Sequence, residues 1–162
     1  MRPLFLLAFT LLVTTGCQTE QPPPPPGDGD AETIPFRRDG SLTFSREDGE
    51  EIVTIDIEIA EGDSATARGL MDRTSLPEKS GMLFLMPRTQ RHSFWMANTP
   101  LSLDITFVSP DSAVINTAKY TRPFSSENVS AEGLSRFVVE TQAGFTDTWG
   151  ITAGDRVRWT RD

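Results

Sequence analysis

The chain of 162 residues carries 15 Lys and Arg against 23 Asp and Glu, a formal net charge of −8 at neutral pH. An acidic protein repels phosphate backbones, and no cluster of basic and aromatic side chains offsets this charge, so we expect no nucleic-acid partner. With one cysteine, Cys17, and one histidine, His92, the chain cannot form an internal disulfide or a zinc site of Cys and His ligands. We therefore expect neither a metal nor another cofactor.

Residues 1–16 have the pattern of a secretory signal peptide. Arg2 precedes an almost uninterrupted apolar run from Leu4 to Val13. This run is too short to cross the bilayer core as a helix, which takes about 20 residues. We expect it to be cleaved rather than kept as a membrane anchor.

Small residues stand directly before the cysteine. Thr15 and Gly16 followed by Cys17 resemble the lipobox of bacterial lipoproteins, in which the cysteine becomes the lipidated first residue of the mature chain. Thr14 occupies the place where that motif usually has Leu, and cleavage by ordinary signal peptidase is the alternative. The resemblance implies lipidation at Cys17 and a membrane partner held through the lipid.

Residues 17–33 have the composition of a tether. Five consecutive prolines, Pro22 to Pro26, favour a semi-rigid extended stretch, and the Gly and Asp residues after them favour a solvated one. Such a segment holds a domain away from a lipid surface. We expect residues 34–162 to form one domain in the cell envelope, in the periplasm or at the outer membrane if the cell has two membranes.

The first half of this domain alternates short strands with one helix. Strands over 41–47 and 51–59 flank Asp48-Gly49, a strong hairpin signal. Asp63 is expected to cap a helix over 64–71. The apolar run over 81–86, stopped by Pro87, predicts a strand buried on both faces.

The second half continues with short elements around a long loop. The loop covers 120–135, and loops of this length in compact domains are usually functional or mobile. The other elements expected here are strands over 91–96, 101–109, 113–118, 136–141 and 155–160 and a helix over 143–149. This pattern predicts a single α+β domain, with a strongly curved mixed sheet or partly closed β-barrel and two short helices.

Four blocks of residues in this domain resemble the bacterial and archaeal family called domain of unknown function 192. In chain order they are Arg68–Met71 with Arg73 and Leu76, Gly81–Phe84, Phe94–Met96 with Asn98 and Thr99, and Leu103–Ile105 with Phe107. The resemblance implies a mixed α/β fold with a barrel-like sheet. It implies no activity, because none is established for the family.

Two acidic residues, Asp104 and Glu140, interrupt apolar strands, where an unpaired charge is costly. One interpretation is structural: each carboxylate pairs with Arg68, Arg73 or Arg136, or accepts backbone N–H groups at a strand end. The other is that they are the two acids of an envelope hydrolase acting on glycans or peptides. The sequence leaves both interpretations open.

Nucleophilic catalysis finds little support in the sequence. His92, the one candidate base, stands next to Ser93 in a segment expected to be a strand, where neighbouring side chains point to opposite faces. We interpret His92 as a surface residue or a hydrogen-bonded structural residue. We assign no catalytic residue, and only the hydrolase alternative would give such a role to Asp104 and Glu140.

A cation, an aromatic ring and polar groups form the most suggestive combination. Arg68, Trp95, Met96, Asn98 and Asp104 are candidate ligand-binding residues, with the ring for stacking and the guanidinium for bidentate contact with an anionic or polar group. Core packing and an Arg68–Asp104 clamp are the structural alternatives. We favour a non-enzymatic envelope module that binds a small ligand or a protein segment; the alternatives are the hydrolase and a structural or assembly lipoprotein.

Overall fold

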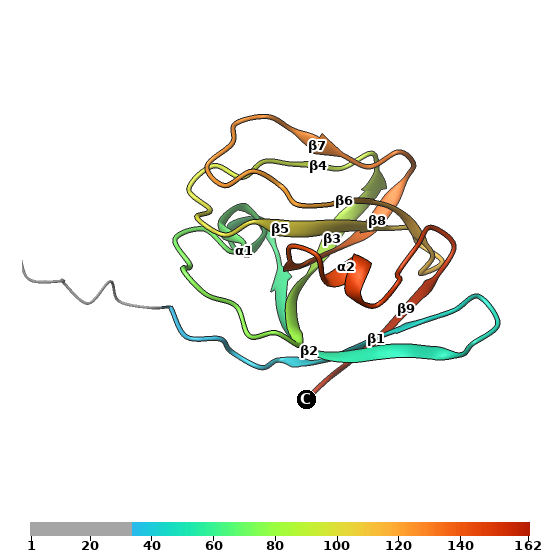
Figure 1. Ribbon diagram of the computed structural model, residues 1–162. Coiled ribbons are helices and arrows are strands. Elements are labelled where there is room, and N and C mark those ends of the chain that lie inside the picture. The colour runs from blue at the N-terminus through green and yellow to red at the C-terminus, as the bar shows by residue number, and fades with distance from the viewer. Residues whose placement is uncertain (1–33) are drawn as a thin grey trace, which may run out of the picture. The chain divides into compact units, whose positions relative to one another are not determined.

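The computed structural model describes residues 34–162 (Figure 1). The expectations for the signal peptide, Cys17 and the tether lie outside these residues. The elements are β1 (Gly40–Ser45), β2 (Glu51–Glu61), α1 (Asp63–Arg68), β3 (Ser80–Gln90), β4 (Ser93–Phe94), β5 (Leu103–Val108), β6 (Val114–Ala118), β7 (Val129–Ser130), β8 (Ser135–Gln142), α2 (Phe145–Thr148) and β9 (Arg156–Arg161). Neither helix of this region has the length and apolar character needed to cross a bilayer.

Seven strands form one mixed sheet in the order β6-β5-β8-β3-β2-β1-β9, and β4 pairs with β7 in a small second sheet. The pairs in the large sheet are antiparallel except for β2 and β3, which are parallel and joined through α1. The hairpin of β1 and β2 turns at Asp48-Gly49, as predicted, with Gly49 at φ 94°. Glycine takes this positive φ without steric cost.

The large sheet is strongly curled, so that its two edges meet (Figure 1). A bridge joins Ala113, just before β6, to Arg156 at the start of β9. The Val114 N–H donates to Asp155 O at 2.7 Å beside it. This confirms the predicted α+β domain with a curved, partly closed barrel and two short helices.

The curled sheet encloses one apolar core and carries a second on its outer face. The inner core contains Phe44, Ile55 and Leu83 together with Phe145 of α2. The outer core contains the buried residues Ala60, Leu70, Leu76, Met82, Phe84, Met96, Leu103, Ile105, Phe107, Ala131 and Val138. Strands β3, β5 and β8 therefore have buried residues on both faces, as the sequence predicts for β3.

Two local expectations were wrong. Strand β3 continues past Pro87 to Gln90, because its pairing with β8 is irregular between Leu85 and Gln90 and a missing N–H costs little there. Helix α1 is shorter than expected: Gly62 takes the N-cap position instead of Asp63, and Gly69, at φ 48° and ψ −132°, ends it.

The segment 120–135 also differs from the expected long loop. It contains β7, and it buries Thr121 and Ala131. Backbone hydrogen bonds attach it to the segment around β4: the Met96 N–H donates to Ser125 O at 3.0 Å, and the Ala131 N–H donates to His92 O at 2.9 Å. This segment covers part of the outer core.

Candidate functional site

A pocket of about 350 Å³ lies on the outer face of the sheet beside α1. This volume is within the range of small-molecule sites, which combine apolar walls with a few polar groups. This pocket likewise combines apolar side chains with a few polar ones in its lining. It is lined by Thr66, Ala67, Arg68, Gly69, Leu70, Met71, Phe84, Met86, Ser93, Phe94, Trp95, Thr99, Asn128 and Glu140.

Gly69 opens the buried end of this pocket. A Cβ atom at this position would lie 3.2 Å from Cζ of Phe84 and 3.9 Å from Oε2 of Glu140. The backbone φ of 48° and ψ of −132° is also one that residues with side chains rarely adopt. A side chain here would intrude on the space beside the Glu140 carboxyl group.

Glu140 is the buried acidic group of the pocket. It is 5% exposed, and its neighbours across the sheet are Met82 on β3 and Ile105 on β5. Its Oε2 atom has no hydrogen-bond partner among the described residues. Burial raises the pKa of Glu140 to about 8, because no cation compensates the loss of hydration. At neutral pH this side chain is therefore mostly a neutral acid.

Two more polar side chains belong to the α1 side of the pocket. Thr66 has a buried hydroxyl oxygen with no partner among residues 34–162. Arg68, in the last turn of α1, is exposed and forms no ion pair within that region. Among the described residues that line the pocket, only Arg68 and Glu140 are charged or titratable.

Aromatic rings form a further part of the pocket lining. Phe84 and Phe94 meet edge to face, with ring centroids 5.0 Å apart and planes at 82°, and Phe94 in turn packs against Phe107. Trp95 is 56% exposed and belongs to the rim. The sulfur-containing side chains of Met71 and Met86 complete the apolar lining.

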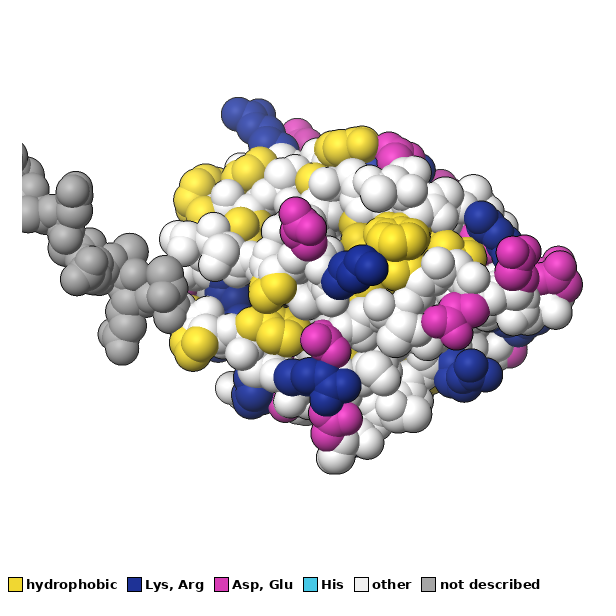
Figure 2. Space-filling view, turned by 60° about the horizontal axis from the view of Figure 1, so that its bottom comes forward, with side chains coloured by type: hydrophobic (Ala, Val, Ile, Leu, Met, Phe, Trp, Pro, Cys, Tyr) yellow, Lys and Arg dark blue, Asp and Glu magenta, His cyan; other side chains and the backbone are white. Residues whose placement is uncertain are grey.

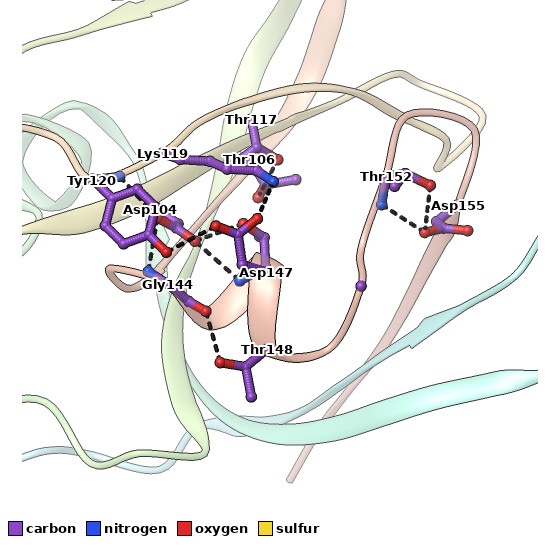
Figure 3. Close-up of polar contacts among 12 residues, drawn as sticks. Asp104, Thr106, Thr117, Lys119, Tyr120, Gly144, Asp147, Thr148, Thr152 and Asp155 are labelled. Carbon is purple, nitrogen blue, oxygen red and sulfur yellow. Dashed lines mark hydrogen bonds and ion pairs between the residues drawn. The ribbon is translucent and has the colours of Figure 1, made fainter.

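Asp104, the second acid in an apolar strand, points towards Tyr120 and the start of α2 (Figure 3). Ile105 is the partner of Glu140 in the register of β5 and β8, so the adjacent Asp104 faces the other side of the sheet. It is fully buried, and its Oδ1 atom accepts the backbone N–H groups of Tyr120 at 3.0 Å and Gly144 at 3.1 Å. Its Oδ2 atom accepts the N–H and the hydroxyl of Thr146, at 3.0 and 2.6 Å. The carboxylate thus fixes the segment before β7 and the start of α2 to β5.

The structural interpretation through backbone N–H groups therefore holds for Asp104, and the interpretation through an arginine partner was wrong for both acids. Arg73 pairs instead with Glu58, through two contacts of 2.7 Å between buried side chains. The Arg37 N–H donates to the same carboxylate at 2.9 Å. Among the buried carboxyl groups of residues 34–162, only that of Glu140 has a buried oxygen without a partner.

The structure brings together two of the five candidate ligand-binding residues. Arg68 and Trp95 both line the pocket. Met96 is buried in the outer core, and Asn98 occupies a turn at φ 58° where its carbonyl accepts the Asp72 N–H at 2.8 Å. Asp104 lies on the opposite face. No ligand contact tests these assignments, and they stay predictions.

Several lining residues were absent from the sequence-based candidates. Nothing in the sequence distinguishes Thr66, Phe84 and Met86, as pocket residues, from residues of the apolar core. Glu140 was considered as a structural group or as a hydrolytic acid and not as a ligand-binding residue, although the alternation of Val138 and Glu140 along β8 indicates that both side chains share the outer face. That alternation was the signal available.

Other chemistries find no site in the described region. His92 is buried, and its Nε2–H donates to the Arg88 carbonyl at 2.9 Å, while Ser93 is exposed. No group of three or more His, Cys, Asp and Glu side chains within residues 34–162 could hold a metal ion. On the face shown in Figure 2, basic and acidic side chains are interspersed, with no single large basic patch.

Comparison with known proteins confirms the resemblance found in the sequence. The model of the family DUF192, described as an uncharacterized ACR, matches residues 44–159. A crystal structure of a protein of unknown function from Novosphingobium aromaticivorans is 34% identical, with a TM-score of 0.69 over 74% of this chain and 84% of that one. A Sinorhizobium meliloti protein described as a candidate transcription regulator is 25% identical, with a TM-score of 0.72 over 77% and 97% of the two chains. The sequence has no match among curated proteins.

Proposed function

We propose that this chain, which belongs to the DUF192 family of uncharacterised proteins, is an exported, membrane-tethered envelope module that binds a small ligand without transforming it. One observation carries the proposal: the outer-face pocket combines apolar walls with an unpartnered buried acid, Glu140, and an exposed cation, Arg68. A pocket of this composition suits an organic molecule with an apolar body and polar ends.

The ligand body packs between α1 and the aromatic wall of Phe94 and Trp95. Its acidic end meets Arg68, whose planar guanidinium can bind a carboxylate through two parallel hydrogen bonds. Because Arg68 is exposed and has no ion pair among the described residues, a ligand carboxylate displaces no internal partner. Trp95 at the rim contributes a large ring face, which is 56% exposed.

Binding is favoured over hydrolysis because the two acids cannot act together. Glu140 faces the pocket, whereas Asp104 is fully buried on the opposite face and accepts hydrogen bonds from Tyr120, Gly144 and Thr146. A general acid and a second carboxylate must flank one substrate bond. The pocket lining offers no second carboxyl group.

The test of the pocket uses 3-phenylpropanoate as the probe and the amide NMR spectrum of the full chain as the readout. We expect shifts concentrated at Gly69, Phe94 and the Trp95 indole, and at least fivefold weaker binding in Arg68→Gln. Arg158→Gln is the matched control, because Arg158 is an exposed arginine on β9 that does not line the pocket. Shifts that gather elsewhere, or equal losses in both variants, would exclude this site.

Export and anchoring rest on residues 1–33. The apolar run before Cys17, the small residues at 15–16 and the prolines at 22–26 support a lipid anchor followed by a spacer. Mass spectrometry of the N-terminal peptide from envelope-expressed protein tests this. We expect a diacylglyceryl group on Cys17, and release of Cys17→Ala into the soluble fraction; an unmodified cysteine in a soluble chain would exclude the anchor.

A second candidate, an assembly lipoprotein, is favoured by large apolar side chains on the surface. Trp95 and Phe124 are 56% and 66% exposed, and their segments are joined by the bond from the Phe124 N–H to Thr99 O at 3.1 Å. Sedimentation velocity of the chain and of Phe124→Ser tests self-assembly at this surface. If the wild-type chain and the variant both sediment as monomers, self-assembly at this surface is excluded and the small-ligand function remains.

A further inference from the structure

We propose that the buried end of the pocket receives the ammonium group of an amino-acid-like zwitterion, with Glu140 as its counter-charge and Arg68 binding the carboxylate at the rim. This inference rests on the proposed ligand-binding function and specifies the chemistry of the ligand. The placement of Glu140, the acceptors and rings around it, and the other charges nearby each contribute to it.

Glu140 differs from the other buried acids in what it lacks. Asp104 accepts four hydrogen bonds, and Glu58 is paired with Arg73. Glu140 is also buried, but its Oε2 atom has no partner among the described residues, and its side chain lines the pocket next to Gly69, which has no side chain to cover it. A buried polar group without a partner costs about 1–3 kcal/mol. A ligand that supplies hydrogen-bond donors and positive charge would recover that cost.

The groups around Glu140 favour a cation over an anion. Thr66 lines the same pocket and has a buried oxygen without a partner among the described residues, so the lining offers a primary ammonium, with its three N–H donors, acceptors on two elements. The rings of Phe84, Phe94 and Trp95 line the same pocket, and aromatic faces attract cations and repel anions. A ligand carboxylate is better placed at the exposed Arg68.

Binding of the ammonium displaces a proton. Burial holds the pKa of Glu140 at about 8, so at pH 7 the free pocket contains mostly the neutral acid. When the cation enters, the carboxyl O–H bond breaks, the proton leaves to solvent and the electron pair stays on the carboxylate. Affinity for an ammonium should therefore rise about tenfold for each pH unit up to about pH 8 and level off there, until the ligand's own ammonium group loses its proton at higher pH.

Among the described residues, no other group that lines the pocket titrates in the range over which this affinity changes. Its neighbours on β3 and β5 are Met82 and Ile105, and α1 contributes only the permanently charged Arg68. The lining residues of β4 and of the segment before β7 are not titratable at these pH values. Asp104 belongs to the other face of the sheet.

Three matched probes separate the contributions of the two charged groups of the ligand. They are phenylalanine, 2-phenylethylamine, which lacks the carboxylate, and 3-phenylpropanoate, which lacks the amine. Calorimetric titration of the full chain at pH 7, in two buffers of different ionisation enthalpy, measures affinity and proton release together. We expect phenylalanine to bind at least tenfold more tightly than 3-phenylpropanoate and to release close to one proton.

Two variants test which residue binds which charged group of the ligand. Glu140→Gln keeps the shape and neutrality of the protonated acid, so it should fold normally; we expect it to abolish proton release and to weaken phenylalanine and 2-phenylethylamine at least tenfold, with 3-phenylpropanoate unchanged. Arg68→Gln should weaken phenylalanine and 3-phenylpropanoate only. Rescue of the proton release by Glu140→Asp would strengthen the assignment, since it restores an acid.

Failure of the ammonium inference gives a different result from failure of the ligand-binding function. If 3-phenylpropanoate binds at the pocket as tightly as phenylalanine, and Glu140→Gln changes neither, the ammonium inference is wrong while the ligand-binding function stands. If no probe binds at the pocket in the wild-type chain, both are wrong for ligands of this class.

Discussion

Asp104 on β5 and Glu140 on β8 are buried carboxyl groups on neighbouring strands, and they point to opposite faces of the sheet. Asp104 accepts four hydrogen bonds that join β5 to the start of α2 and to Tyr120 (Figure 3). Glu140 lines a pocket and its Oε2 atom has no partner in the described region. The first carboxyl group is therefore hydrogen-bonded at both oxygens, whereas burial favours the neutral form of the second.

The difference separates a structural group from a candidate functional one. Removing Asp104 would leave its donors buried without acceptors, so the fold depends on it. Removing the charge of Glu140 costs the fold nothing, because no described residue compensates that charge. A buried ionisable group beside a pocket is a candidate for a functional role.

The largest expected effect is the loss of stability when Asp104 is replaced. Replacement by Ala leaves the N–H groups of Tyr120, Gly144 and Thr146 and the hydroxyl of Thr146 without their acceptor. At about 1–3 kcal/mol for each buried unpaired group, we expect a loss of unfolding free energy on the order of 5 kcal/mol or more. Urea denaturation measures it; a loss below about 1 kcal/mol would mean that Asp104 does not hold these segments together.

Glu140→Gln should change stability in the opposite direction, and only at higher pH. The folded pKa of about 8 lies above the ordinary value of 4.5, so the contribution of Glu140 to stability is complete below pH 4.5 and is lost as the pH rises towards 8. That loss is on the order of 5 kcal/mol as an upper limit. We expect the variant to match wild type at pH 4.5 and to exceed it at pH 9. Equal pH profiles for the two proteins would show that Glu140 is ionised in the fold.

Gly69→Ala should produce a smaller loss of stability together with a loss of binding. The backbone at Gly69 is strained for any other residue, which costs about 1–3 kcal/mol, and the added Cβ would lie 3.2 Å from Phe84. Gly154→Ala is the matched control, because Gly154 also has positive φ but has open space around it and lies outside the pocket. We expect similar destabilisation in thermal melts, and weaker phenylalanine binding in Gly69→Ala only. Equal binding by both variants would contradict the placement of the ligand beside Gly69.

Much of the fold follows from local patterns. The alternation in β2, the Asp48-Gly49 turn and the apolar run of β3 depend on neighbours along the chain, and they predicted the curved α+β sheet correctly. The end of α1 and the continuation of β3 past Pro87 depend on backbone torsion and on pairing with β8. Those features require the tertiary structure.

The site was harder to predict for a physical reason. Arg68 and Trp95 were recognisable because a cation and a large ring are unusual residues, and they do line one pocket. Which acid accompanies them depends on the face to which each strand residue points: Glu140 shares the face of Val138, while Asp104 points inward. Alternation within each strand can be read from neighbouring residues, but the alignment of the two strands across the sheet cannot.

The most direct measurement is the titration of the Glu140 carboxyl group by ¹³C NMR in the full chain, with Glu140→Gln to assign the signal. We predict a pKa of about 8 in the free protein and a fall of at least one pH unit when phenylalanine is bound, since an ammonium in the pocket favours the carboxylate. A pKa near the ordinary value of 4.5 in the free protein would contradict the neutral buried acid on which the ligand assignment depends.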